Sequence, residues 1–310
     1  MIALVQTAYE GLSSLQLEET PLAKASPLSV TVKTAYTPIL PWDWRLANGE
    51  LASMQARRPP MIISYGFTGT VTKVGALCSA SLQDQPVLGI NPSGAAQTIN
   101  VVPPLPYLFK LPAEVSLAAA ATLIGGADAA LSLIKAAHVQ TGQVVIVTGA
   151  TGGVGTALIQ LLKEQGAIVI GLTAPQNKAW LHQLGSNYEL DYTQPLAPQL
   201  AQLPKPALLL DAVGQPELLT QLSTNQPELA IWSLSLQQWQ PPLASQTFQF
   251  TNRPLLPADY RHLLDLLATQ QLQPIIRATY DFHDFQTAFK TAQTHGQHGR
   301  VLLSYDSSLN

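Results

Sequence analysis

Two kinds of hydrophobic patterning divide the chain. Its first part carries short β-prone runs separated by prolines and glycines, at residues 29–35, 68–74 and 98–102. Short strands between turn residues are typical of a small, mainly β domain. Residues 113–137 are instead rich in alanine at helical spacing, with an interruption at Gly125 and Gly126. We therefore expect a domain boundary near this helix.

From residue 144 onward, strand-like apolar runs alternate with amphipathic helical patterns, which predicts a doubly wound parallel sheet. After about residue 249 the alternation weakens into two amphipathic helices and a closing strand, and we expect this tail to rejoin the N-terminal, mainly β lobe. The prediction is an α/β fold in three stretches. They are a first part of the substrate domain at residues 1–118, a dinucleotide-binding domain at 119–249 and a return to the substrate domain at 250–310.

The segment TGATGGVG, residues 148–155, joins a predicted strand to a predicted helix. In such a βαβ unit Gly152 lets the backbone approach a pyrophosphate closely, and Gly155 lets the helix pack against the strand. The helix N-terminus adds free amide groups and a positive dipole end. A glycine-rich loop without a ligand is the alternative, but the flanking elements favour a nicotinamide dinucleotide. The turn residues expected at the cofactor are Ala150, Thr151, Gly152, Gly153 and Val154.

The end of the next predicted strand bears on which nicotinamide is bound. An NAD-selective site usually has an acidic residue there, about 20 residues after the glycines, for the ribose 2′-hydroxyl. This strand ends at Thr173 with no carboxylate, and Lys178 follows. A 2′-phosphate would find a hydroxyl in Thr173 and a charge partner in Lys178, so we expect NADP(H) to be preferred over NAD(H). The alternative for Lys178 is an ordinary solvated residue at a helix start.

Composition and charge exclude several classes of protein. The chain has 310 residues, 46% of them apolar and 11% charged, which indicates a globular protein with a sizeable core. Its net charge is −3, without a basic run, which argues against a nucleic-acid partner. Cys78 is the single cysteine, and we see neither a signal peptide nor an apolar run long enough to cross a bilayer. We expect a cytoplasmic protein without a membrane partner.

Several segments resemble the medium-chain dehydrogenase/reductase superfamily, and within it the zinc-free quinone oxidoreductases. The motifs are YGFTGTVTKVG, LPAEVSLAAAATL, VVIVTGATGGVGTALIQLLKEQGAIVIGLT, LLLDAVG and HGRVLLS, spread over nearly the whole chain. The resemblance implies a Rossmann domain inserted into a GroES-like mainly β domain, with the nicotinamide between the lobes, and a homodimer. It also implies further cofactor contacts, beyond the turn, at Thr173, Lys178, Tyr192, Ser233, Leu234, Ser235 and Arg253.

Metal chemistry is not expected. Zinc-dependent members of the superfamily need Cys and His ligands around an open position. Where they have Gly-His-Glu, this chain has Ser64, Tyr65 and Gly66. Its N-terminal, mainly β lobe holds no cysteine except Cys78. We predict no metal site.

Three residues are candidates for chemistry at the acceptor, each with a structural alternative. Asp43 lies between Trp42 and Trp44 in a segment where the family has Asn-x-x-Asp, and it either faces the cleft or caps a helical turn. Asp128 stands where the family has a threonine; it either orients a polar substrate, or acts as an acid if desolvation raises its pKa, or caps the following helix. Tyr65 either donates to a carbonyl oxygen or is a buried core residue.

The leading hypothesis is therefore an NADPH-dependent, zinc-independent oxidoreductase that transfers a hydride to a small-molecule acceptor, a quinone or another conjugated carbonyl. A 2-enoyl thioester reductase is the nearest alternative, although no basic patch for its carrier is legible in the sequence. A cofactor-binding structural or regulatory protein with little turnover is a third hypothesis, which the missing Asn and the substitution at Asp128 keep open.

Overall fold

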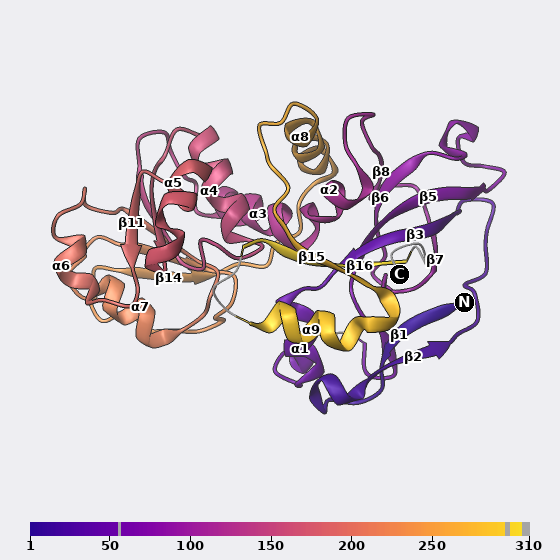
Figure 1. The fold of residues 1–310 in the computed structure, drawn as a ribbon, viewed down its shortest axis with the longest axis horizontal. Helices are drawn as coiled ribbons and strands as arrows, with labels where there is room; N and C mark the ends of the chain where they lie inside the picture. Colours follow the sequence, from indigo (N-terminus) through magenta and orange to yellow (C-terminus); the bar gives the residue numbers. More distant parts are fainter. Residues whose placement is uncertain (55–56, 295–297, 306–310) are drawn as a thin grey trace.

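The computed structural model describes residues 1–54, 57–294 and 298–305. The chain forms two lobes, one built on a parallel sheet and the other mainly on antiparallel strands (Figure 1). In the figure the parallel-sheet lobe lies at the left, and the mainly antiparallel lobe lies at the right with both labelled termini. The last strands of the chain return to this second lobe.

The first lobe contains a six-stranded parallel sheet in the order β11-β10-β9-β12-β13-β14. Its strands are β9 (Val144–Val147), β10 (Ile168–Thr173), β11 (Tyr188–Asp191), β12 (Leu208–Asp211), β13 (Ala230–Ser233) and β14 (Thr247–Phe250). The helices between them are α4 (Gly155–Glu164), α5 (Lys178–Leu184), α6 (Leu196–Leu200) and α7 (Pro216–Ser223). The strand order reverses between β9 and β12, which is where doubly wound sheets bind their ligands. The predicted Rossmann sheet is confirmed.

The second lobe holds a seven-stranded sheet in the order β15-β16-β3-β5-β6-β8, with β7 also paired to β3, and a small sheet in the order β2-β1-β4. The strands are β1 (Ile2–Gln6), β2 (Leu15–Glu19), β3 (Val30–Pro38), β4 (Met61–Ile62), β5 (Gly66–Val74), β6 (Pro86–Ile90), β7 (Ile99–Val102), β8 (Leu108–Lys110), β15 (Ile276–Asp281) and β16 (Arg300–Ser304). Helix α1 (Pro41–Ala47) follows β3. The predicted β-rich domain is confirmed, and β16 from the far end of the chain pairs with β3 within it.

The alanine-rich segment is a broken helix. Helix α2 (Leu117–Ala121) and helix α3 (Asp128–Ala136) flank a kink at which Ile124 is extended and Gly125 has a φ of 59°. Glycine adopts such a φ without strain, and a Cβ there would also lie 2.9 Å from Leu40 Cδ1. The break places Asp128 at the start of α3, where its side chain is buried.

The same segment corrects the expectation that no apolar run reaches the length of a membrane span. Residues Leu117–Ala136 pass that test by length and composition. In the fold, however, 61% of their most apolar window is buried, and the kink divides them between two helices. The segment is part of the hydrophobic core. Its alanine content was the signal of an apolar run that the sequence analysis missed.

Helices α8 (Pro257–Ala268) and α9 (Phe285–Gln293) come from the last part of the chain. Helix α9 packs on β15 and β16, as expected for a return to the second lobe. Helix α8 instead packs on α2 and α3, and its Tyr260 and Leu263 share a core cluster with Val145. The return to the β-rich lobe is therefore completed only at β15, later than the predicted boundary at residue 250.

Candidate active site

The glycine-rich turn after β9 is shaped by close backbone approaches. A Cβ on Gly155 would lie 2.6 Å from Ala150 Cα, and one on Gly152 would lie 3.3 Å from the Gly149 oxygen. The side chain of Ala150 is fully buried in the core. Because these positions have no room for side chains on the inner face of the turn, its backbone amide groups remain the groups that a phosphate could meet. The turn thus has the cradle that a dinucleotide pyrophosphate requires.

Arg300 lies directly against this turn. Its guanidinium donates to the carbonyl oxygens of Ile39 and Gly125, and a Cβ on Gly153 would lie 2.6 Å from its Cζ. The residue is 5% exposed and its Nε atom finds no hydrogen-bond partner among the described residues. A buried cation with a spare donor at a phosphate cradle is suited to hold a phosphate oxygen. Sequence analysis missed Arg300, although a lone arginine in the apolar run GRVLL was a usable signal.

A cleft of about 500 Å³ runs past both features. The expected residues that line it are Thr151, Gly152, Gly153, Val154 and Ser235. The ends of the strands beneath it are joined through Asp211, which accepts hydrogen bonds from the hydroxyls of Thr148 at 2.7 Å and Ser233 at 2.6 Å. Ser233 therefore holds the sheet together, and it does not present its hydroxyl to the cleft.

The residues expected at the adenosine end lie together beyond β10. Thr173 stands opposite Asp191 in the register of β10 and β11, and the Tyr192 backbone N–H donates to the Thr173 carbonyl. The Thr173 hydroxyl is buried without a hydrogen-bond partner among the described residues. Lys178 begins α5 and lies near enough to Asp191 to help lower the pKa of that carboxyl, after the hydrogen bond from Thr193. The Asp191 carboxylate at this end was not anticipated from the sequence.

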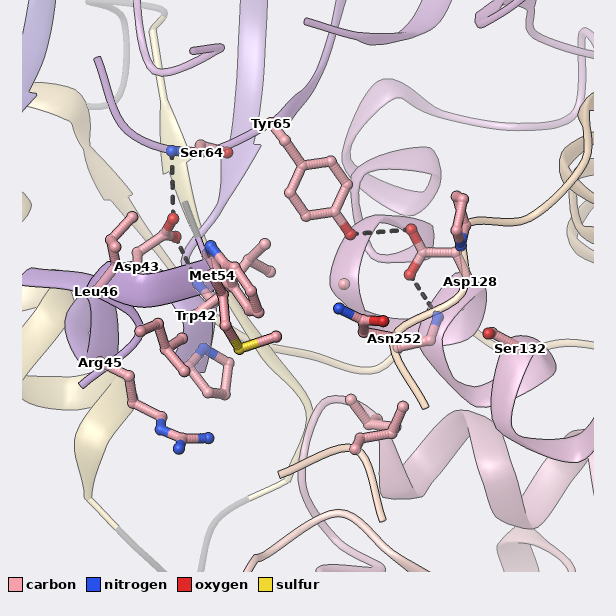
Figure 2. Close-up of a pocket in the computed structure, with 18 of the residues that line it drawn as sticks. Trp42, Asp43, Arg45, Leu46, Met54, Ser64, Tyr65, Asp128, Ser132 and Asn252 are labelled. Atoms are coloured by element: carbon pink, nitrogen blue, oxygen red, sulfur yellow. Dashed lines mark hydrogen bonds between the residues drawn. The ribbon is translucent and has the colours of Figure 1, made fainter. Parts of the chain in front are cut away.

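A second, larger cavity of about 660 Å³ adjoins the cleft (Figure 2). The two share Val154, Ala212 and Ser235 in their walls, together with Pro41 and Arg45. The wall of the larger cavity is mostly apolar, with aromatic side chains from both lobes at Trp42, Tyr65, Tyr107, Phe250 and Tyr260. It also includes the expected residues Asp43, Asp128, Leu234 and Arg253. Leu234 and Arg253, which were expected at the cofactor, line this cavity and do not line the cleft.

The Asp43 side chain supports the structure of the site and contributes little to its open surface. Its carboxylate accepts hydrogen bonds from the backbone N–H groups of Leu40 at 3.0 Å and Ser64 at 3.2 Å, and it is 3% exposed. Burial raises its pKa to about 7, against the lowering effect of these two donors and of the Arg300 charge. Asp43 thus caps α1 and fixes the loop before β5, as the structural alternative proposed.

Asp128 and two tyrosines form a hydrogen-bonded cluster on the other side of the cavity (Figure 2 shows Tyr65 and Asp128). The hydroxyls of Tyr65 and Tyr260 each donate to Asp128 Oδ2 at 3.0 Å, and the backbone N–H of Ala129 donates to Oδ1 at 2.6 Å. Burial raises the pKa of Asp128 and, together with the carboxylate, those of both tyrosines. Tyr260 was missed because it lies 132 residues from Asp128 in an ordinary amphipathic helix.

Metal ligands do not gather in this region. Within residues 1–54, 57–294 and 298–305, no three His, Cys, Asp or Glu side chains form a group that could hold a metal ion. Ser64 and Gly66, which occupy two positions of the Gly-His-Glu motif, flank Tyr65 at the cavity wall.

Comparison with known proteins agrees with this geometry. The family model described as the NAD dependent epimerase/dehydratase family matches residues 145–214. A zinc-type alcohol dehydrogenase-like protein of Schizosaccharomyces pombe is 26% identical, covering 92% of this chain and 89% of the relative. A quinone oxidoreductase-like protein 2 homolog of Nematostella vectensis is 31% identical, covering 44% of this chain and 38% of the relative. The solved quinone oxidoreductase of Coxiella burnetii has the same fold, with a TM-score of 0.84, 20% identity and 99% of each chain covered.

Fold and cleft together define a two-lobe dehydrogenase with a nicotinamide dinucleotide site at the glycine-rich turn. The motifs and the fold of the chain resemble those of the medium-chain dehydrogenase/reductase superfamily. The relatives and the matched family model support an NAD(P)H-dependent oxidoreductase.

Proposed function

We propose that this oxidoreductase uses NADPH to reduce quinones and other conjugated carbonyl compounds without a metal ion. The observation that carries the proposal is the junction between the phosphate cleft and the apolar cavity at Val154, Ala212 and Ser235. A dinucleotide held at the glycine turn and an acceptor held in the cavity would meet there. When bound, the reduced nicotinamide supplies a hydride.

The shape and chemistry of the cavity favour flat conjugated acceptors. Its volume of about 660 Å³ falls within the usual range for small-molecule sites, and aromatic side chains of both lobes line it. Such side chains bind flat, unsaturated molecules through stacking and edge contacts. Arg45 donates to the Ser235 carbonyl oxygen at 3.1 Å, so the two lobes are held together at the cavity wall.

The preference for NADPH rests on the adenosine end. Thr173 offers an unpartnered hydroxyl at the end of β10, and Lys178 offers a nearby cation for a 2′-phosphate. Asp191 does not compete strongly for the ribose, because its Oδ1 atom already accepts the Thr193 hydroxyl at 2.7 Å and the Thr193 N–H at 2.8 Å.

The proposal is tested by titrating the purified protein with NADPH and NADH and then adding quinones and 2-alkenals. We expect tighter binding of NADPH and consumption of it with at least one acceptor. Tighter binding of NADH would refute the cofactor preference. Binding of NADPH without consumption by any acceptor of these classes would refute the acceptor assignment. Full activity after dialysis against a chelator is expected, and its loss would refute metal independence.

A 2-enoyl thioester reductase is the second candidate, favoured by one observation. The exposed side chains of Arg57 and Arg253 line the cavity from separate segments, a basic feature that the sequence did not reveal. Two arginines suit the phosphates of a thioester carrier. Replacing both with alanine would then raise the KM for an enoyl thioester and leave the KM for a neutral quinone unchanged. Equal effects on both substrates would count against this candidate.

We also propose that the protein is a homodimer. Strand β14 lies at the edge of the parallel sheet and is paired only with β13 among the described strands. An unpaired edge presents backbone donors and acceptors to a partner strand, and a second copy would satisfy them. Light scattering coupled to gel filtration would give twice the mass of the chain, and a monomer mass would refute the dimer.

A further inference from the structure

The cluster of Tyr65, Asp128 and Tyr260 lines the acceptor cavity, and none of its three residues lines the phosphate cleft. As the structure has it, both hydroxyls donate to the same carboxylate oxygen. With Asp128 ionised, the cluster holds two protons and uses both for its internal hydrogen bonds. With Asp128 protonated, it holds three protons, and two internal hydrogen bonds leave one hydroxyl hydrogen free. The protonated cluster therefore has one donor to offer, and the ionised cluster has none.

The free donor belongs to Tyr65 because of how the two tyrosines are buried. Tyr260 is 6% exposed and packs its ring against Phe109, at 5.2 Å between the centroids. Tyr65 is only half-buried, and Figure 2 shows its hydroxyl beside Asp128, with the Asn252 side chain below. The hydrogen bond from Tyr260 to Asp128 is buried, whereas the one from Tyr65 is only partly buried, so a carbonyl oxygen that enters the cavity has better access to the Tyr65 hydroxyl.

We infer that Tyr65 is the proton donor to the acceptor oxygen and that Asp128 supplies the proton that Tyr65 gives away. This inference rests on the proposed reduction of conjugated carbonyls. The acceptor gains a hydride, supplied by the reduced nicotinamide, at its β carbon. The π electrons of its C=C bond then form a double bond between the α carbon and the carbonyl carbon, and the π electrons of the C=O bond move to the oxygen. That oxygen takes the proton of the Tyr65 hydroxyl and becomes an enol. The Asp128 proton passes to the Tyr65 oxygen, and solvent later returns a proton to the Asp128 carboxylate.

The groups around the cluster favour both the protonated Asp128 carboxyl and the brief loss of the Tyr65 proton. Burial raises the pKa of Asp128, which keeps the carboxyl protonated at a higher pH than an exposed aspartate. Burial and the Asp128 charge raise the pKa of Tyr65, while the Arg300 charge and a backbone hydrogen bond from Gly125 act in the opposite direction. The last two groups stabilise a phenolate for the short time before Asp128 replaces the proton.

Tyr65→Phe is the first test, since it removes the donor and keeps the ring. A general acid contributes about 100-fold or more to a rate, so the single-turnover rate of reduction should fall by about that factor and lose its solvent isotope effect. Tyr305→Phe is the matched control, because it removes a buried hydroxyl that pairs with Thr37 outside both cavities. We expect an unchanged rate and isotope effect for the control.

The pH dependence separates proton supply from a packing role. The charged and titratable groups that act on Asp128 are Tyr260, Tyr65 and Arg300. The rate in the wild type should fall as the pH rises through the pKa of Asp128. Asp128→Asn should lose this alkaline limb along with most of the rate. Tyr260→Phe removes a hydrogen bond that lowers the pKa of Asp128, so it should move the same limb to higher pH.

A measurement on the cofactor-free protein keeps the inference separate from the proposed activity. The infrared band of a protonated carboxyl should persist to a higher pH than that of an exposed aspartate, be weakened in Asp128→Asn and persist to still higher pH in Tyr260→Phe. Asp43 adds its own band, so the difference between wild type and Asp128→Asn isolates Asp128. Weaker binding of an unreactive saturated ketone by Tyr65→Phe, by about fivefold, would report the lost hydrogen bond.

Each outcome bears on the inference. If the isotope effect survives in Tyr65→Phe and the alkaline limb survives in Asp128→Asn, the inference is overturned. The proposed reductase activity would then still stand. If the wild type reduces none of the acceptors, the proposed function fails, and the infrared and ketone measurements still decide whether the cluster holds and offers a proton. In that case, unchanged infrared bands and unchanged ketone binding in the variants would overturn the inference.

Discussion

The two halves of the active site are built in different ways. The phosphate cleft is made mostly of backbone from one continuous segment, residues 148–155, where glycines make room for a ligand. The acceptor cavity is made of side chains from both lobes, and its polar cluster joins Tyr65, Asp128 and Tyr260. A site made of backbone is fixed by local sequence, whereas a site made of converging side chains depends on the whole fold.

Gly153→Val would test the phosphate cleft most severely. The added side chain would meet the Arg300 guanidinium, since even its Cβ would lie 2.6 Å from Cζ. We expect loss of measurable dinucleotide binding in a fluorescence titration. Gly142→Asn is the control, because Gly142 has a φ of 79° with open space around it, and asparagine tolerates that conformation. If Gly153→Val binds as the wild type does, the turn is not the phosphate cradle.

Asp43 provides a stability test on the cavity side. Its folded pKa of about 7 lies above the ordinary aspartate value of 3.8, so the folded state binds more protons between these values. The free energy of unfolding should therefore be highest below about pH 4 as far as Asp43 is concerned, and fall by up to about 4 kcal/mol as the pH rises to 7.

Asp43→Asn should flatten this slope in urea titrations at several pH values. Its overall stability should also be lower, since an asparagine oxygen can accept from the Leu40 or the Ser64 N–H while its amide group faces the other donor. An unchanged slope would show that Asp43 does not titrate in this range.

Arg300→Met would test the residue that joins the two halves. It leaves the carbonyl oxygens of Ile39 and Gly125 without their donor and removes the cation that lowers the pKa of Asp43 and Asp128. We expect a loss of about 3 kcal/mol in the free energy of unfolding. Arg261→Met, which loses only an exposed contact over the Phe109 ring, should cost about 0.5 kcal/mol. Equal losses would contradict a joining role for Arg300.

Lys178→Ala should have the smallest effect, confined to the adenosine end. The loss of one partly exposed charge partner should weaken NADPH binding by about tenfold and leave NADH binding unchanged. Lys205→Ala is the control, because Lys205 precedes β12. It therefore lies at the amino ends of the parallel strands, away from the carboxyl ends that face the cofactor. Parallel weakening of both dinucleotides would remove Lys178 from the 2′-phosphate site.

The same contrast explains what could be predicted from the sequence. Glycine spacing, the apolar runs and the end of β10 at Thr173 identified the sheet and the turn, since each signal lies within one short segment. Asp128 was noticed only as a departure from a motif. Its partners could not be predicted, because the convergence of Tyr65 and Tyr260 on Asp128 depends on the kink at Gly125 and on helix α8 packing against α3. The role of Arg300 could not be predicted either, because its partners Ile39 and Gly125 lie far from it in the sequence.

The position of Arg300 has a consequence for the order in which the site is made during synthesis. The parallel sheet ends at Phe250 and can form while the chain is still growing, yet Arg300 lies 175 residues after its partner Gly125. At about 5 to 20 residues per second, translation needs on the order of 9 to 35 s to cover that distance. A growing chain therefore carries a formed glycine turn without its cation, and the cleft gains its full affinity only when β16 has emerged and joined β3.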